Sequence, residues 1–271
     1  MRSLANGVEL SWREVGIGPP VVLIHGLADD HRAWRSVVPD LALRSDVFLY
    51  DLRGHGESAL GDADGTLLQL SEDLAALMEV AGIGPAVLGG FSLGGTVAMR
   101  CAIDHPELVS ALALVATSSR VNSAAAQWYR ERAEAVDSGD PGLRRRLDAD
   151  TADVYASHPE QLADGLLIRR QSTADPRGFA NACRAMAGLN EHPLDDELAG
   201  IAVPTVVVAG ERDQHCPPRA AEIIASRVAG SSVIVLPGTG HAAPLEEPAK
   251  VAEAIAFMTQ RLEGRGACTS A

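Results

Sequence analysis

The chain has 271 residues, of which 23 are Lys or Arg and 36 are Asp or Glu, so its formal net charge is −13. An acidic surface of this kind disfavours nucleic acid as a partner. The sequence has no apolar run of about eighteen residues, which disfavours a membrane span, and its first residues lack the apolar core of a signal peptide. We therefore expect a cytoplasmic protein that binds neither nucleic acid nor membrane, and make no prediction of its oligomeric state.

The first elements are short and rich in β-forming residues. Apolar side chains alternate with polar ones over residues 8–12, which predicts a half-buried strand. Continuous apolar runs at 21–24 and 47–50 are typical of strands buried on both faces of a parallel sheet. Between these runs, residues 33–43 are predicted to form a helix.

The alternation of strand and helix then continues. A helix is predicted from Ser71, as its N-cap, to Ala81. A strand over 86–91, a helix over 94–105 and a strand over 111–116 follow. This order predicts an α/β fold in which helices flank a mostly parallel central sheet.

Residues 118–196 interrupt the pattern. They contain no β-rich run, show helical periodicity, and carry ten arginines and thirteen acidic residues. The segment is too long for a loop, so it predicts a helical insertion between a first core part, 1–117, and a second, 197–271. The second part is expected to contain strands at 204–209 and 232–236, helices at 219–228 and 248–262, and a loose tail from Gly264.

One serine lies where a reactive hydroxyl is expected. Ser92 is the centre of the run Gly90-Phe91-Ser92-Leu93-Gly94, at the junction of a predicted strand and a predicted helix. The glycines allow the backbones of the two elements to approach closely, and the sharp turn lifts the hydroxyl above the sheet edge.

A serine hydroxyl needs a base, and the base needs a partner that orients it. His241 follows the last predicted strand and Asp213 the strand before it. Open α/β sheets place their sites at the carboxyl ends of such strands, so Ser92, Asp213 and His241 are predicted to converge. Glu211, two residues before Asp213, is the alternative for the acidic role.

Metal and cofactor motifs are missing from the sequence. The four cysteines are far apart and the eight histidines show no ligand spacing, so no metal site is predicted. No strand is followed by the glycine fingerprint of a dinucleotide site, and we expect no cofactor.

The motifs together resemble the α/β-hydrolase superfamily, in a form with a serine nucleophile and a helical cap. They are His25-Gly26-Leu27, the run 51–58 (DLRGHGES), the Ser92 turn, Asp213 and His241. Within the superfamily the chain most resembles enol-lactonases, small esterases and cofactor-free perhydrolases. The resemblance implies that 118–196 is the cap and that His25 supports the loop beneath the site.

The resemblance also implies a chemistry: attack by Ser92 on a small ester or lactone, with His241 and Asp213 as base and orienter. The backbone amides of Leu27 and Leu93 would bind the oxyanion. Trp128, Tyr129 and Phe179 are candidates for the pocket wall, and one or two cap arginines could point inward to a substrate carboxylate. The alternatives are a C–C bond hydrolase, thioesterase or lyase with the same residues, and a small-molecule receptor on this scaffold.

Overall fold

The computed structural model describes residues 1–268, with side chains to residue 260. Its centre is an eight-stranded sheet in the order β1-β2-β4-β3-β5-β6-β7-β8. The pairs β1–β2 and β2–β4 are antiparallel, and every later pair is parallel. The strands are β1 Arg2–Ala5, β2 Val8–Gly16, β3 Pro20–Ile24, β4 Asp46–Tyr50, β5 Ala86–Phe91, β6 Val109–Val115, β7 Thr205–Gly210 and β8 Ser232–Leu236.

The expected α/β fold with a mostly parallel sheet is confirmed. The central strands β3, β5, β6 and β7 are buried along almost their whole length, as continuous apolar runs predict. The sequence analysis missed β1, which pairs with the first half of β2 at the antiparallel end of the sheet.

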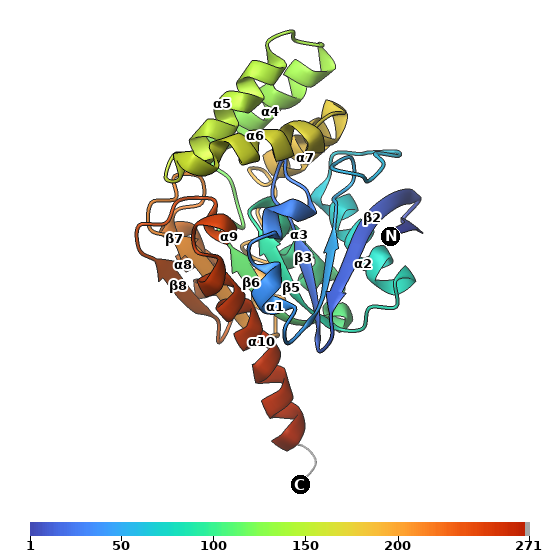
Figure 1. Cartoon of the computed structure of the whole chain (residues 1–271), viewed down its shortest axis with the longest axis vertical. Helices are drawn as coiled ribbons and strands as arrows, with labels where there is room; N and C mark the ends of the chain where they lie inside the picture. The colour runs from blue at the N-terminus through green and yellow to red at the C-terminus, as the bar shows by residue number, and fades with distance from the viewer. Residues whose placement is uncertain (269–271) are drawn as a thin grey trace.

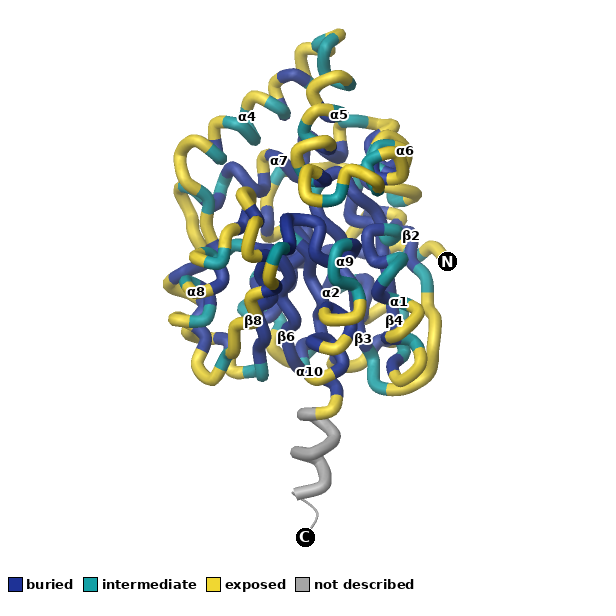
Figure 2. Tube along the Cα trace, turned by 60° about the vertical axis from the view of Figure 1, so that its left-hand side comes forward, coloured by how far each residue is buried: buried dark blue, intermediate teal, exposed yellow. Residues whose placement is uncertain are grey.

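Helices cover both faces of the sheet (Figures 1 and 2). Because side chains alternate along a strand, Val22 and Ile24 of β3 join one buried cluster and Val21 and Leu23 join another. On the first face lie α2 Leu67–Val80, α3 Leu93–Asp104 and α8 Pro218–Arg227; on the second lie α1 Val38–Leu41 and α10 Pro248–Cys268. The site is therefore mounted on a sheet buried from both sides.

Two expected helices in the first part of the core are wrong in their bounds. Residues 33–43 form a 3₁₀ turn, His31–Trp34, and the single-turn α1 instead of one helix. Pro39 lacks an N–H and its ring would clash with the preceding turn, so a continuous helix cannot pass through it. Helix α2 starts before Ser71, because Thr66 is its N-cap and accepts a hydrogen bond from the amide of Gln69.

The insertion between β6 and β7 is helical. It contains α4 Ser123–Asp137, α5 Leu143–Val154, α6 Leu162–Ser172 and α7 Pro176–Gly188, and lies over the carboxyl ends of the strands (Figure 1). Helix α7 approaches the core at Gly178, where an added Cβ would lie 1.9 Å from the carbonyl oxygen of Gly54. We keep 118–196 as the proposed bounds of this cap.

The C-terminal helix is longer than expected. Helix α10 continues to Cys268, so its expected end at Leu262 is wrong, as is a tail beginning at Gly264. Residues 269–271 of that tail lie outside the described part of the chain. Short helical segments complete the path: α9 Ala243–Glu246 and the 3₁₀ turns Pro106–Leu108, Pro159–Gln161 and Leu198–Gly200.

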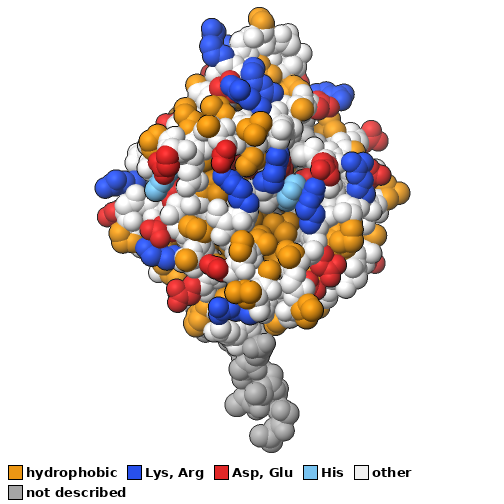
Figure 3. Space-filling model, in the orientation of Figure 1, with side chains coloured by type: hydrophobic (Ala, Val, Ile, Leu, Met, Phe, Trp, Pro, Cys, Tyr) orange, Lys and Arg blue, Asp and Glu red, His pale blue; other side chains and the backbone are white. Residues whose placement is uncertain are grey.

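The surface carries both signs of charge. On the face seen in Figure 3, acidic and basic side chains are interspersed over the core and the cap. Among the described residues, no helix is both long enough and apolar enough to cross a bilayer.

Candidate active site

Ser92 lies on a strained turn between β5 and α3. Its φ is 51° and its ψ is −118°, in a region that side-chain-bearing residues rarely adopt. The turn is held by two bonds: the Ser92 amide donates to the Val115 carbonyl at 2.9 Å, and Thr117 Oγ1 donates to the Ser92 carbonyl at 2.6 Å. Gly94 must be glycine here, since a Cβ would lie 2.2 Å from the Ile24 carbonyl oxygen.

His241 connects Ser92 to Asp213. Its Nε2 lies 3.1 Å from Ser92 Oγ, and its Nδ1 lies 2.8 Å from Asp213 Oδ2. Because an ionised carboxylate only accepts, Nδ1 carries the proton and Nε2 is left to accept from the serine hydroxyl. The structure thus brings together the three side chains that the sequence analysis selected.

Asp213 is held in its charged form. Burial by itself would raise the pKa of Asp213, but the facing His241 and the amides of Cys216 and His215 lower that pKa below its usual value. The alternative, Glu211, is exposed and instead accepts a hydrogen bond from the Gly238 amide at 2.7 Å. Asp213 therefore occupies the position beside His241.

The loop 26–29, here called the oxyanion loop after the role that the resemblance implies for Leu27, lies beside Ser92: a Cβ added to Gly26 would be 3.3 Å from Ser92 Cβ. His25 supports it: His25 Nε2 accepts from the Leu52 amide at 2.8 Å, so Nδ1 is left to donate to the Gly26 carbonyl, also at 2.8 Å. Within the described residues, the backbone amides of Leu27 and Leu93 donate to no protein acceptor. Both are free to receive an anionic oxygen.

The cap is fastened to this loop through α6. Arg169 Nη2 donates to the Leu27 carbonyl at 2.7 Å, and Arg169 Nε lies 3.5 Å from Asp29 Oδ1. Ser172, one turn later, donates to the Asp29 carbonyl. These bonds fix the peptide after Leu27, where Ala28 has the unfavourable φ of 63°.

Arg169 fits the expectation of an inward cap arginine, with a side chain only 11% exposed. Its neighbour Asp29 is buried at the edge of the site, and burial raises the pKa of that carboxyl despite the nearby charge of Arg169. The cap arginine count suggested a candidate of this kind, but nothing in the sequence distinguished Arg169 from the other nine.

A cavity of about 460 Å³, here called the site cavity, contains Ser92 and His241 in its wall. Trp128 and Tyr129 of α4 also line it. Phe179 does not; its side chain is buried in a packed cluster with Ala133 and Leu147, so we correct it from pocket wall to cap core.

His215 is a site residue to which the sequence analysis assigned no task. Its ring centroid lies 4.8 Å from that of His241, and its Nε2 lies 3.1 Å from Asp153 of the cap helix α5. Burial and the neighbouring His241 lower the pKa of His215. The one sequence feature that could have indicated His215 as a site residue is its position two residues after Asp213.

Asp30, His31 and Asp51 are residues of the kinds that bind metal ions, and their potential ligand atoms lie within 4.8 Å of one another. Their oxygens are already engaged, since Arg32 donates to both oxygens of Asp30 and His31 Nδ1 lies 2.7 Å from Asp51 Oδ1. Burial would raise the pKa of Asp51, but the bonds from His31 and from the Glu57 amide lower it to about 2. We interpret the group as a structural brace under the oxyanion loop.

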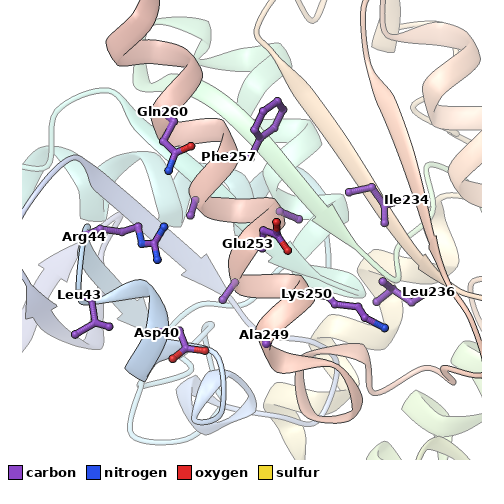
Figure 4. A pocket seen from close by; sticks show the side chains of 13 residues that line it. Asp40, Leu43, Arg44, Ile234, Leu236, Ala249, Lys250, Glu253, Phe257 and Gln260 are labelled. Atoms are coloured by element: carbon purple, nitrogen blue, oxygen red, sulfur yellow. The ribbon is translucent and has the colours of Figure 1, made fainter.

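A larger cavity, about 740 Å³, lies on another part of the surface. Figure 4 shows Glu253, Phe257 and Gln260 of α10 on one side and Ile234 and Leu236 of β8 on the other. Its lining includes none of the residues gathered around Ser92. We therefore assign the chemistry to the site cavity.

Comparison with known families identifies the class. The family model described as alpha/beta hydrolase fold matches residues 19–248, so the chain belongs to that family. This confirms the resemblance inferred from the motifs.

Individual relatives include esterases and a lactonase. The chain is 31% identical to pimeloyl-[acyl-carrier protein] methyl ester esterase of Aeromonas hydrophila, over 92% of this chain and 98% of the relative. It is 29% identical to 3-oxoadipate enol-lactonase 1 of Acinetobacter baylyi, over 86% and 85%. A malate-bound thermophilic esterase from Thermogutta terrifontis superposes with a TM-score of 0.83 at 29% identity, over 97% of this chain and 99% of that one.

Proposed function

We propose that the protein is a serine hydrolase that cleaves small carboxylic esters or lactones through an acyl-serine intermediate. The observation that carries the proposal is the hydrogen-bonded series Ser92–His241–Asp213, with distances of 3.1 and 2.8 Å. The named activities of the relatives support the bond type, because two are esterases and one is a lactonase.

The geometry supports the following reaction. Ser92 Oγ attacks the carbonyl carbon while His241 Nε2 takes its proton, and the charged Asp213 stabilises the resulting imidazolium. The new oxyanion binds the Leu27 and Leu93 amides, each worth about 3 kcal/mol of barrier. The carbon–oxygen bond to the alcohol then breaks, and His241 gives the alcohol its proton. Water, activated by the same histidine, cleaves the acyl-serine and releases the acid.

The test is labelling with a fluorophosphonate, combined with hydrolysis of a short-chain p-nitrophenyl ester. We expect wild type to be labelled and to turn over, and Ser92→Ala to lose labelling and about five orders of magnitude in kcat. Full turnover by Ser92→Ala would refute the proposal.

The same experiment separates the other two hypotheses. A C–C hydrolase or lyase that uses His241 only to move a proton would show neither a burst nor an acyl-serine. A receptor would bind small molecules without turnover on any ester. Neither has an observation in the structure that favours it over the acyl-serine route.

A further inference from the structure

A second cavity adjoins the site cavity. It has a volume of about 550 Å³ and lies between the start of α4 and the β7–α8 loop. Four residues line both cavities: Asn122, Ala125, Tyr129 and His215. The two cavities therefore lie next to each other and share a wall at these four residues.

The position of His215 indicates which part of a substrate would extend there. In the proposed reaction, the departing alcohol oxygen must lie within reach of His241 Nε2 to receive its proton. The ring of His215 lies beside that of His241, at 4.8 Å between centroids and tilted by 51°, and forms part of the wall of both cavities. The second cavity thus shares a wall residue with the neighbourhood of the histidine that would protonate the leaving alcohol, which is why we assign the alcohol to it.

The two cavities differ in charge. The site cavity has three carboxylates in its wall, those of Asp29, Asp150 and Asp153, and one arginine. Asp150 pairs with Arg132 outside the wall, and Asp29 faces Arg169 within it. The second cavity has two arginines, Arg120 and Arg219, and none of its described lining residues is Asp or Glu. This reversal stands out in a chain whose net charge is −13.

Both arginines keep donors available. Arg120 contacts Asp195 through Nε at 3.2 Å, and Arg219 contacts Glu222 through Nη1 at 3.0 Å. Each guanidinium has five N–H donors, so an additional carboxylate can still be bound by the remaining ones. The other residues of the wall are mostly apolar, Leu189 and Ile223 among them.

We propose that the second cavity binds the leaving alcohol of the substrate and favours an alcohol with a carboxylate at the end of an apolar spacer. The inference rests on the proposed ester hydrolysis and specifies its substrate class. Recognition would come from Arg120 and Arg219, the spacer would contact the apolar wall, and the ester would remain at Ser92.

The first test uses two esters that differ only far from the reacting bond: 3-(4-butyryloxyphenyl)propanoate and its carboxamide. Their phenols are equally good leaving groups, so a difference in kcat/KM reports the carboxylate. We expect wild type to favour the carboxylate about fivefold, from ion pairs with two largely exposed arginines, and 0.5 M NaCl to reduce that preference. Arg120→Gln with Arg219→Gln should bring the ratio to about one and leave kcat/KM for the carboxamide within twofold.

Arg130→Gln is the matched control. Arg130 is an exposed arginine of α4 that pairs with Glu191 and lines neither cavity, so its loss should leave the ratio unchanged. A ratio near one in wild type, or a ratio that the double variant leaves intact, overturns the anion preference. If neither ester is hydrolysed at all, the proposed function fails instead.

A steric variant tests the position of the alcohol independently. Ala220 of α8 lines the second cavity and not the site cavity. The substitution Ala220→Phe would therefore narrow only the second cavity. We expect Ala220→Phe to lower kcat/KM for the arylpropanoate ester about tenfold and to leave kcat/KM for methyl butyrate within twofold of wild type. Equal loss on both esters, or loss only on esters with enlarged acyl groups, would overturn the leaving-group assignment. Circular dichroism and the melting temperature check that the variant is folded.

Discussion

The floor and the roof of the site cavity are built in different ways. The floor comes from the core, where His25 and Asp51 are buried and, like the partly buried Ser92, are held by hydrogen bonds with the backbone. The roof comes from α4 to α6, whose contacts include many ion pairs at partly exposed side chains, such as Arg170 with Asp148. Displacing the buried floor would break these backbone hydrogen bonds, whereas side chains at exposed ion pairs of the roof contribute little to stability. We infer that the core specifies the reaction and the cap selects the substrate.

The largest expected effect tests the floor. Asp213→Asn should lower kcat about 10⁴-fold, because the amide cannot stabilise the imidazolium and favours the wrong tautomer of His241. The matched variant is Glu211→Gln, which changes the neighbouring acid on the same loop and should alter kcat less than twofold. Ester kinetics on both variants decide the assignment; the reverse ranking would transfer the acidic role to Glu211.

An intermediate effect concerns the brace under the floor. Asp51 has a pKa of 3.8 in its unperturbed state and about 2 in the fold, so its charge stabilises the protein above pH 4. That stabilisation, about 2 kcal/mol, is lost as the pH falls from about 4 to about 2. Asp51→Asn should therefore be less stable than wild type at pH 7, with a difference that shrinks towards pH 2. Urea unfolding at several pH values measures it, and a constant difference would contradict the prediction.

The smallest effect is expected where roof and floor meet. Arg169→Met removes the bond to the Leu27 carbonyl and should lower kcat about tenfold with little change in KM, since the proposed oxyanion donor loses its support. Arg170→Met, the next residue on α6, removes only an exposed ion pair and should leave kcat unchanged.

Chemical rescue separates support of the loop from general damage to the cap. Added guanidinium should restore part of kcat in Arg169→Ala and none in Ser92→Ala. If Arg169→Met raises KM while kcat is unchanged, then Arg169 contacts the substrate and does not position the loop.

The sequence was sufficient to predict the central strands and the Ser92 turn, because the signals for these elements are local. Buried parallel strands read as continuous apolar runs, and the glycine-flanked Ser92 follows one of them directly. Prediction from local signals failed where two such signals in one segment favoured different helix boundaries. Pro39 divided an otherwise helical segment, and the capping side chain of Thr66 started α2 earlier than Ser71 would have done.

The cap shows what local signals cannot supply. Trp128 and Phe179 are both large aromatic side chains on cap helices, yet only Trp128 faces the site cavity, because that depends on how α4 and α7 pack against each other and the core. Likewise, ten cap arginines are equivalent in sequence, and only the fold places Arg169 on the Leu27 carbonyl.

The sequence by itself determined the class of fold, the nucleophile candidate and the order of Ser92, Asp213 and His241 along the chain. These depend on residue type and on position at strand ends, which a linear pattern records. Only the tertiary structure decided that Asp213 faces His241 while Glu211 faces a turn, and that a cationic cavity adjoins an acidic one. Those facts depend on side-chain direction and on contacts between segments far apart in the chain, which the order of residues does not encode locally.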